Sequence, residues 1–294
     1  MEMYLEGVST RKVKDVTEEL CGTSFSKSLV SSLASRLDSE LEAWRNRRLE
    51  AQAYPYLFVD ARYEKVRVDS RVVSQGVLVV SGVRDDGLRE ILAVEVADTE
   101  SEASYQALFR SLKRRGLSGV GLVVSDEHEG LKAAIARHFQ GAAHQRCQVH
   151  YASNLLGMVG AKRRKDLAED LRGVFAAPNR EVALGLASEL ADRWRRSHPG
   201  VAEHVEEHIE ECLTCLTFPE GHRKRIRTTN GLERFNQELK RRTRVVRIFP
   251  NRGSCLRLVS ALAIEQSEEW LTGRRYLDMS ELAERCYEKR AEEG

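Results

Sequence analysis

The sequence predicts an α/β fold: a mixed sheet with flanking helices, preceded by a helical segment and interrupted by an all-helical insertion. Three observations support this prediction. Residues 56–96 form three β-rich runs joined by short turns, as in an antiparallel meander. Residues 101–149 alternate helical periodicity with short apolar runs, which is typical of parallel strands linked by helices. Residues 151–221 show helical periodicity alone.

The first 50 residues have helical patterns. A predicted helix from Arg11 to Leu20 is broken by Gly22, and a second helix follows Ser26. Two helices joined by a short glycine turn suit a helix-turn-helix DNA reader, although plain packing hairpins of this kind are just as common. The stretch from Leu41 to Arg48 continues as a basic helical connector.

Three strands are predicted next. The first, Tyr56–Val59, leads into Asp60, and the other two are Val72–Val83 and Arg89–Val96. Asp85-Asp86-Gly87 is the hairpin turn between the second strand and the third. Consecutive strands with such short connections are expected to pair antiparallel.

Parallel β-α units follow the meander. A helix is predicted over Ser101–Arg115, a buried strand over Val120–Val124, a second helix over Glu129–Phe139 and a last strand over Ala143–Val149. The order is therefore β-β-β-α-β-α-β. A meander followed by parallel crossovers is the ribonuclease H-like layout, in which the first and fourth strands are neighbours.

Two aspartates fall where these neighbouring strands end. Asp60 ends the first strand and Asp126 directly follows the fourth, so both carboxylates are expected at one edge of the sheet. Like charges this close repel each other and raise a pKa. A divalent cation would stabilise them, because Mg²⁺ prefers hard oxygen ligands and can act in pairs in phosphoryl transfer. The alternatives are local: Asp60 could cap a turn, and Asp126 could cap the next helix.

Basic residues cluster toward the C-terminal end of the sequence. Twelve Lys or Arg lie between His222 and Arg257, with only two acids, Glu233 and Glu238, among them. Such a stretch is typical of proteins that contact a polyanion. The formal net charge of the whole chain is only +2, so the positive charge is concentrated in this one segment.

Glu233 belongs to a predicted helix over Leu232–Arg242, whose apolar residues have helical spacing. Asn230 could cap this helix, which would put Glu233 in the capping-box position. The other interpretation makes Glu233 a third carboxylate, which a basic helix would bring to Asp60 and Asp126 at the place where phosphates must lie.

The cysteines offer a second metal hypothesis. Cys147-x-x-His150 and Cys212-x-x-Cys215 together supply the four ligands of a zinc site. Cys212 and Cys215 also fit as buried residues in the middle of a helix over residues 201–216. The other helices of the insertion are predicted over residues 155–159, 162–174 and 180–196. Ser197-His-Pro199-Gly200 is predicted to break the helical pattern between the last of these and the helix over 201–216.

Trp194 lies in the third of these helices. It could stack on an unpaired base, but a tryptophan on an amphipathic helix more often belongs to the core.

Composition limits the class of protein. At 294 residues the chain can hold one large domain or two, and a hydrophobic fraction of 41% can fill a core. No apolar run reaches the roughly 18 residues of a membrane span, and no signal peptide pattern opens the sequence. The six cysteines are scattered, which indicates reduced thiols. We expect a cytoplasmic, nucleoid-associated protein that does not contact a membrane.

Four motifs in this sequence resemble those of bacterial mutator-type insertion-sequence transposases. They are Asp60-Ala-Arg-Tyr-Glu-Lys-Val-Arg67, Ser125-Asp126-Glu-His-Glu-Gly-Leu-Lys132, Cys147-Gln-Val-His150 and Arg227-Thr-Thr-Asn-Gly-Leu-Glu233-Arg-Phe-Asn236. The motifs are long and occur in the order typical of that family. The resemblance runs from about Tyr4 to Tyr276.

This resemblance implies a DDE transposase with a ribonuclease H-like core, which cleaves DNA at transposon ends and transfers the strands to target DNA. Asp60, Asp126 and Glu233 would be its catalytic residues and would hold two Mg²⁺ ions, with Mn²⁺ able to substitute. The implied partners are double-stranded DNA, at the transposon ends and at the target, and further copies of the chain when DNA is bound. Four motif residues have no assigned role: Cys147, His150, Asn230 and Asn236.

The predicted DNA contacts are basic residues of the C-terminal cluster, which should hold phosphates and carry little sequence information. They are Arg223, Lys224, Arg225, Arg227, Arg234, Lys240, Arg241, Arg242, Arg244 and Arg247.

Four segments are predicted. Residues 1–50 form the helical segment, 51–150 the first part of the ribonuclease H-like core, 151–221 the helical insertion, and 222–294 the last part of the core with Glu233 and the C-terminal helices. Family members usually extend further at the N-terminus, so the sequence is identified as N-terminally shortened. This leaves an alternative: a truncated, non-autonomous, transposase-derived DNA-binding protein without full transposition activity.

Overall fold

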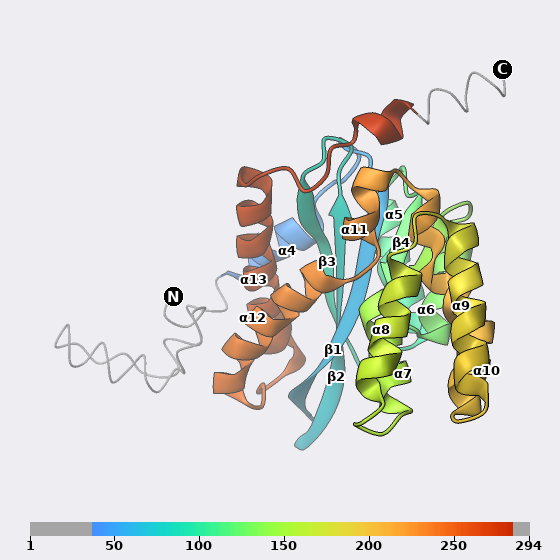
Figure 1. The fold of residues 1–294 in the computed structure, drawn as a ribbon. Coiled ribbons are helices and arrows are strands. Elements are labelled where there is room, and N and C mark those ends of the chain that lie inside the picture. The colour runs from blue at the N-terminus through green and yellow to red at the C-terminus, as the bar shows by residue number, and fades with distance from the viewer. Residues whose placement is uncertain (1–36, 285–294) are drawn as a thin grey trace, which may run out of the picture.

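A computed structural model describes residues 37–284, and Figure 1 labels its elements. The two helices predicted before Leu37 lie outside these residues. The strands are β1 (Tyr56–Val68), β2 (Arg71–Val83), β3 (Arg89–Ala97), β4 (Leu122–Ser125) and β5 (Ala143–Arg146). The helices are α4 (Asp38–Arg45), α5 (Glu102–Arg114), α6 (Glu129–His138), α7 (Gln148–Gly157), α8 (Arg164–Phe175), α9 (Arg180–Arg195), α10 (Pro199–His208), α11 (Glu220–Ile226), α12 (Asn230–Val246) and α13 (Arg252–Thr272).

The five strands form one mixed sheet in the order β3-β2-β1-β4-β5. β1, β2 and β3 make an antiparallel meander, whereas β4 pairs in parallel with both β1 and β5. Gly87, with φ at +84°, allows the tight turn between β2 and β3. The predicted α/β fold with a mixed sheet is confirmed.

Two strand boundaries differ from the prediction. β1 does not end at Asp60 but continues to Val68, because residues 61–68 keep pairing with β2 as one long hairpin. β5 ends at Arg146 rather than Val149, because α7 already begins at Gln148. Asp60 therefore lies inside a strand, and Cys147 lies at a strand-to-helix junction.

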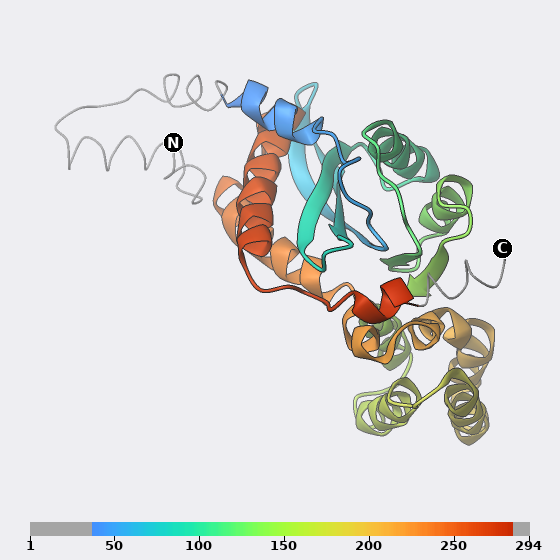
Figure 2. The same cartoon turned by 90° about the horizontal axis from the view of Figure 1, so that it is seen from above.

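Side chains alternate across the sheet and fill two apolar cores. On one face, Tyr56 and Phe58 of β1 pack with α12 and α13, and on the other Leu57 and Val59 pack with α5 and α6. Figure 2 shows the sheet between these two helical layers. Burial on both faces explains the unbroken apolar run Val77-Leu-Val-Val80 in β2.

Helices α7 to α10 form a bundle beside the sheet, with an apolar core of its own (Figures 1 and 2). Pro199 lies in the first turn of α10, so the predicted break before this helix is confirmed. Trp194 is 1% exposed and its Nε1 donates a hydrogen bond to Asp170 at 2.8 Å. The base-stacking hypothesis for Trp194 is therefore wrong, and the residue belongs to the core of the bundle.

α10 ends at His208 rather than near Leu216, and two 3₁₀ turns follow: η1 (Ile209–Cys212) and η2 (Thr214–Thr217). Side chains near the end of β5 bind the backbone here. Gln148 donates to the Cys212 carbonyl at 2.8 Å, and Gln145 accepts from the Cys215 N–H at 2.6 Å. These bonds replace the helical ones and dock the bundle onto the sheet.

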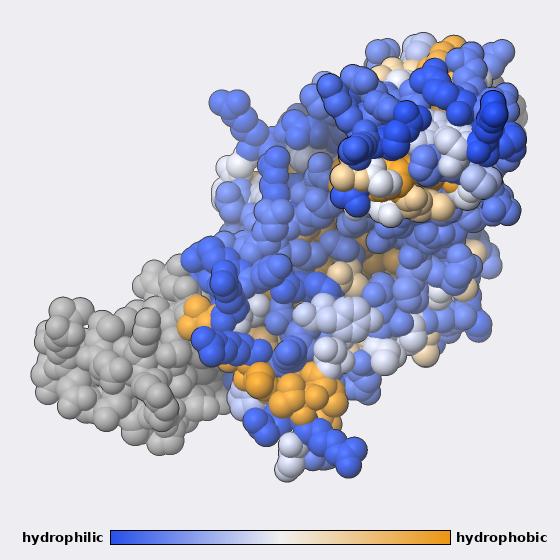
Figure 3. All heavy atoms as spheres, turned by 60° about the horizontal axis from the view of Figure 1, so that its bottom comes forward, coloured by the Kyte–Doolittle hydropathy of each residue, from blue (hydrophilic) through white to orange (hydrophobic). Residues whose placement is uncertain are grey.

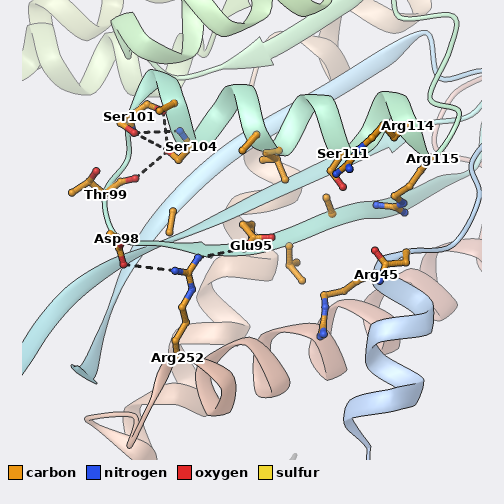
Figure 4. A pocket seen from close by; sticks show the side chains of 17 residues that line it. Arg45, Glu95, Asp98, Thr99, Ser101, Ser104, Ser111, Arg114, Arg115 and Arg252 are labelled. Carbon is orange, nitrogen blue, oxygen red and sulfur yellow. Dashed lines mark hydrogen bonds and ion pairs between the residues drawn. The ribbon is translucent and has the colours of Figure 1, made fainter. Parts of the chain in front are cut away.

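Two surface features lie away from this junction. A cavity of about 610 Å³ follows β3 at the sheet edge, where Arg252 pairs with Glu95 at 3.4 Å and Asp98 at 3.7 Å (Figure 4). Exposed apolar side chains, including Val68 and Val72, gather at the tip of the β1–β2 hairpin, on the face that Figure 3 brings forward.

None of the helices in residues 37–284 combines the length and apolar character that a membrane crossing requires.

Candidate active site

Asp60 and Asp126 occupy matching positions on neighbouring strands. Phe58 of β1 pairs with Val124 of β4, and each aspartate lies two residues further along its segment. Phe58 and Val124 both face α12, so alternation puts Asp60 on the same face. β4 ends at Ser125, which leaves β1 without a β4 partner beside Asp60. The two carboxylates therefore lie where the paired strands separate.

α12 brings Glu233 and Asn236 to this position. The two residues are three apart and share one face of the helix. Asn236 Nδ2 donates a hydrogen bond to Asp60 Oδ2 at 2.7 Å, and the Ala61 N–H donates to Asp60 Oδ1 at 2.9 Å. The adjacent face of α12 is buried through its apolar residues, as predicted: Leu232, Phe235 and Leu239.

The capping interpretations of the acids are wrong. α12 begins at Asn230, and its N-cap residue Thr229 makes no side-chain cap, so Glu233 lies beyond the capping-box position. Asp126 does not cap α6, because the N-cap is His128, whose ring accepts a hydrogen bond from the Leu131 N–H at 3.2 Å. Neither carboxylate has a helix-capping role in this structure.

His150 lies between two of the carboxylates. Its Nδ1 is 3.7 Å from Asp126 Oδ2, and its Nε2 is 3.6 Å from Glu233 Oε1. Contact with the Cys147 sulfur, together with the charges of Asp126 and Asp60, raises the pKa of His150 to about 9 against the effect of burial. The imidazole is therefore charged at neutral pH and offsets part of the negative charge around it.

Cys147 is buried behind His150, at the N-cap of α7. Thr229 donates to its sulfur from both the backbone N–H and the hydroxyl, each at 3.5 Å. Burial raises the pKa of the thiol, but the hydrogen bonds from His150 and Thr229 outweigh it and leave the pKa below its ordinary value. The Cys-x-x-His motif thus ties the start of α7 to the turn that precedes α12.

Asp60 is held in an unfavourable environment for a negative charge. Burial, with a smaller contribution from the charge of Glu233, raises the pKa of Asp60 to about 6. The hydrogen bonds from Ala61 and Asn236 and the charge of His150 act in the opposite direction. A buried carboxyl beside other acids is typical of a functional site rather than a structural one.

Several of these groups could hold a cation. Among the described residues, ligand atoms of Cys147, His150 and Glu233 lie within 4.8 Å of one another. Glu233 Oε1 is buried and accepts no hydrogen bond. Cys212 and Cys215 do not join this group, so the four-ligand zinc hypothesis is wrong for the chain as folded here.

Comparison with known proteins places the chain in a family. The family model described as "Transposase, Mutator family" matches residues 1–273. The chain belongs to this family. Its relatives include the "Transposase for insertion sequence element ISRM5" of Rhizobium meliloti, which is 47% identical over 96% of this chain and 71% of the relative. The transposase for IS256 in Tn4001 of Staphylococcus aureus is 38% identical over 95% of this chain and 72% of the relative.

Among solved structures, the Drosophila P element transposase strand transfer complex matches this Mutator-family chain with a TM-score of 0.36 and 14% identity, over 95% of this chain and 81% of that one. A score this low supports no argument about fold or function. The family assignment rests on the sequence matches alone.

Most of the predicted DNA contacts in this Mutator-family chain are accessible. Arg223 and Arg227 are half-buried, and Arg223 donates to the carbonyls of Phe218 and Pro178. Seven are exposed: Lys224, Arg225, Arg234, Lys240, Arg241, Arg244 and Arg247.

Arg242 is the exception. It is 5% exposed and forms ion pairs with Glu238 at 2.6 Å and Glu265 at 3.4 Å. The prediction of a DNA contact is wrong here, because Arg242 lies three residues after Leu239 and continues the buried face of α12.

Two residues beside Asp60 were missed. Arg62 donates to the carbonyl of Asn236 and pairs with Glu64 at 2.7 Å, and the Thr243 hydroxyl donates to Glu64 at 3.0 Å. These contacts fasten α12 to β1. The available signal was alternation, because Asp60, Arg62 and Glu64 are polar at every second position of one strand.

Proposed function

We propose that this chain is a DDE transposase that cleaves DNA at transposon ends and joins the freed strands to target DNA. One observation carries the proposal: acids from β1, the end of β4 and α12 meet around His150, although they are far apart in the sequence. Membership of the Mutator family supports a transposase over the non-catalytic alternative. Hydrolysis of a phosphodiester would free a 3′-hydroxyl, which would then attack a phosphodiester of the target.

We infer that the core is ribonuclease H-like. The strand order β3-β2-β1-β4-β5, with an antiparallel meander followed by parallel strands, supports this inference. In this description, residues 51–150 and 222–284 form one core and residues 151–221 are a helical insertion between β5 and α12. The separate apolar core of α7 to α10 is consistent with that division.

Asp60, Asp126 and Glu233 are the proposed metal ligands. Their carboxylate oxygens suit Mg²⁺ or Mn²⁺, and the buried Glu233 Oε1, which has no hydrogen-bond partner, is free to act as a cation ligand. When bound, two such ions would stabilise the attacking and leaving oxygens of phosphoryl transfer. Asn236 orients Asp60 through its hydrogen bond.

His150 has a proposed supporting role. Without bound metal its positive charge lies between Asp126 and Glu233 and prevents the acids from repelling α12 away from the sheet. Cys147 and Thr229 hold the backbone on either side of this contact in place.

Double-stranded DNA is the proposed substrate, as transposon end and as target. The exposed basic residues of α11 and α12 supply charge beside the carboxylates that would hold phosphates. Copies of the chain would assemble on DNA, because joining two ends to one target requires more than one active site.

Glu233→Gln tests the proposal, since it keeps the size of the side chain and removes its charge. Binding to a duplex that carries the element's own ends should persist, while Mg²⁺-dependent strand cleavage should disappear. Asp126→Asn is the matched variant on the sheet and should give the same separation of binding from cleavage. Full nicking activity by Glu233→Gln would overturn the assignment of this acid.

A further inference from the structure

An arginine at the start of β3 is enclosed by aromatic rings. The guanidinium of Arg89 lies 3.5 Å from the ring centroid of Trp270, at the end of α13, and 4.4 Å from that of Tyr276. Arg225 approaches Tyr276 at 5.2 Å. Rings over a guanidinium occupy its flat faces and leave its N–H edge to donate hydrogen bonds.

Three arginines gather here without a paired carboxylate among the described residues. Within residues 37–284, the side chains of Arg89, Arg225 and Arg234 form no ion pair with an acid, and the buried Nε of Arg89 has no hydrogen-bond acceptor. Burial lowers the pKa of Arg89 to about 10, and repulsion from Arg225 and Arg234 contributes. Guanidinium groups assembled at such a cost indicate that an anion from outside the chain completes the site.

Two adjoining hollows of about 380 and 440 Å³ open at this arginine. Arg89, Gly231, Arg234 and Tyr276 line both of them. Together the hollows are bordered by six basic side chains and a single acid, Glu269. The basic ones are Arg89, Lys224, Arg225, Arg227, Arg234 and Arg274.

The hollows are lined in part by sequence neighbours of His150 and Glu233. Val149, next to His150, lines one of them, and Gly231 and Arg234 lie on either side of Glu233 along α12. A DNA strand that reached the acids would therefore pass this cluster of charge. None of the three carboxylates lines the hollows, so the cluster is a separate binding position.

We propose that Arg89, Trp270 and Tyr276 form a pocket for one backbone phosphate of the DNA strand that enters the carboxylate site. This proposal rests on the proposed transposase function and adds a fixed point to it. The exposed lysines and arginines of α12 can bind phosphates in several positions. A guanidinium packed against two rings can bind a phosphate in only one position. The pocket would thus set which phosphodiester lies at the acids.

A phosphate suits the pocket better than a base. The ring faces that a base would need are covered by Arg89 and Arg225. Charge-assisted hydrogen bonds from guanidinium to phosphate are among the stronger polar contacts in proteins. Free nucleotides carry the same phosphate chemistry, so the experiment must separate them from DNA.

Arg89 and Gly231 provide two independent variants. Arg89→Gln removes the charge and keeps a hydrogen-bond donor. Gly231→Ala keeps every charge, but its Cβ would lie 2.4 Å from Arg89 Nη1 and must push the guanidinium aside. Alanine also favours the helix, so α12 should fold in this variant.

The test is a phosphate scan of an end-containing duplex, with one neutral methylphosphonate at each position and binding measured in EDTA. For the wild-type protein, we expect roughly tenfold weaker binding at one position near the cleavage point. Both Arg89→Gln and Gly231→Ala should lose sensitivity at that position and keep it elsewhere. Arg244→Gln, which lies outside the pocket, should keep the wild-type sensitivity at that position.

Three outcomes would overturn the proposal. The first is a scan of Arg89→Gln and Gly231→Ala that keeps every sensitive position of the wild type. The second outcome is that millimolar ATP or inorganic phosphate thermally stabilises the wild type but not Arg89→Gln, while the phosphate scan is the same for both proteins. This result would assign the pocket to a free ligand. The third is failure of the wild type to bind DNA, which would also remove the transposase function. If the wild type does not cleave DNA but the two variants alter the phosphate scan as expected, only the transposase proposal fails.

Discussion

Asp60 should make the metal-free protein less stable, and Asp60→Asn should therefore stabilise it. A carboxyl whose pKa rises from 3.8 to about 6 on folding lowers the free energy of unfolding at pH 8 by about 3 kcal/mol, at 1.36 kcal/mol per pH unit. This figure is an upper bound, because the side chain keeps some contact with water. Asn236 Oδ1 is buried without a partner, so a flip of its amide would preserve the hydrogen bond to the new amide.

The size of this destabilisation by Asp60 depends on pH. Between about pH 4 and pH 6 the folded state holds a proton on Asp60 that the unfolded state has released, so wild-type stability falls as the pH rises through this window. Asp60→Asn has no such dependence. The stability that Asp60→Asn gains over the wild type should be absent below about pH 4 and largest above about pH 6. At pH 8 its melting temperature should be higher on the order of 5–10 °C.

Thermal unfolding in EDTA at pH 4, 5 and 8 measures this effect, and repetition in Mg²⁺ tests the site. Mg²⁺ should stabilise the wild type and leave Asp60→Asn unchanged, because a ligand stabilises only the state that binds it. Asp126 is the matched control: its side chain is 44% exposed, so Asp126→Asn should change metal-free stability much less and still lose the response to Mg²⁺. The reasoning fails if Asp60→Asn in EDTA at pH 8 is no more stable than the wild type.

Four further predictions concern the basic helix and the helical bundle. The double variant Lys240→Ala, Arg244→Ala should weaken binding to all DNA sequences alike, without a change in melting temperature. The slope of log K against log salt should fall by about 0.9 for each phosphate that the protein no longer binds. Arg242→Ala should instead destabilise the protein by about 1–3 kcal/mol, because it removes a buried guanidinium that pairs with Glu238 and Glu265. Filter binding and thermal melts separate the two effects. A stable Arg242→Ala protein with weakened DNA binding would contradict this assignment. Trp194→Ala should cost about 3–5 kcal/mol of stability in urea unfolding, since it empties a core position. Trp194→Phe should bind single-stranded DNA as the wild type does, and a selective loss of that binding would restore the stacking hypothesis.

Short-range pattern accounts for what the sequence predicted correctly. β-rich runs bounded by turn residues identified β2 and β3, helical spacing identified the buried face of α12, and Pro199 identified the break before α10. These signals lie within a few residues of the elements they describe. Arg242 was misassigned although its spacing from Phe235 and Leu239 follows the same rule, because its charge was weighed above its position.

Boundaries were less predictable, because they depend on distant partners. β1 extends past Asp60 since β2 continues beside it, and the segment after His208 leaves the α-helix since Gln145 and Gln148 bind its backbone. The N-cap of α12 falls on Thr229 rather than Asn230, where the Cys147 sulfur receives the Thr229 N–H. None of these causes lies within the local sequence.

The sequence by itself determined the order of strands and helices, the acids that could share a sheet edge, and the charge of the helix that carries Glu233, because each depends on residue type and spacing. Only the tertiary structure decided that His150 lies between Asp126 and Glu233, that Asn236 holds Asp60, and that Arg89 stacks on Trp270. The physical reason is that such contacts join segments separated by long stretches of chain. Their geometry is set by how whole elements pack, and local propensity does not encode it.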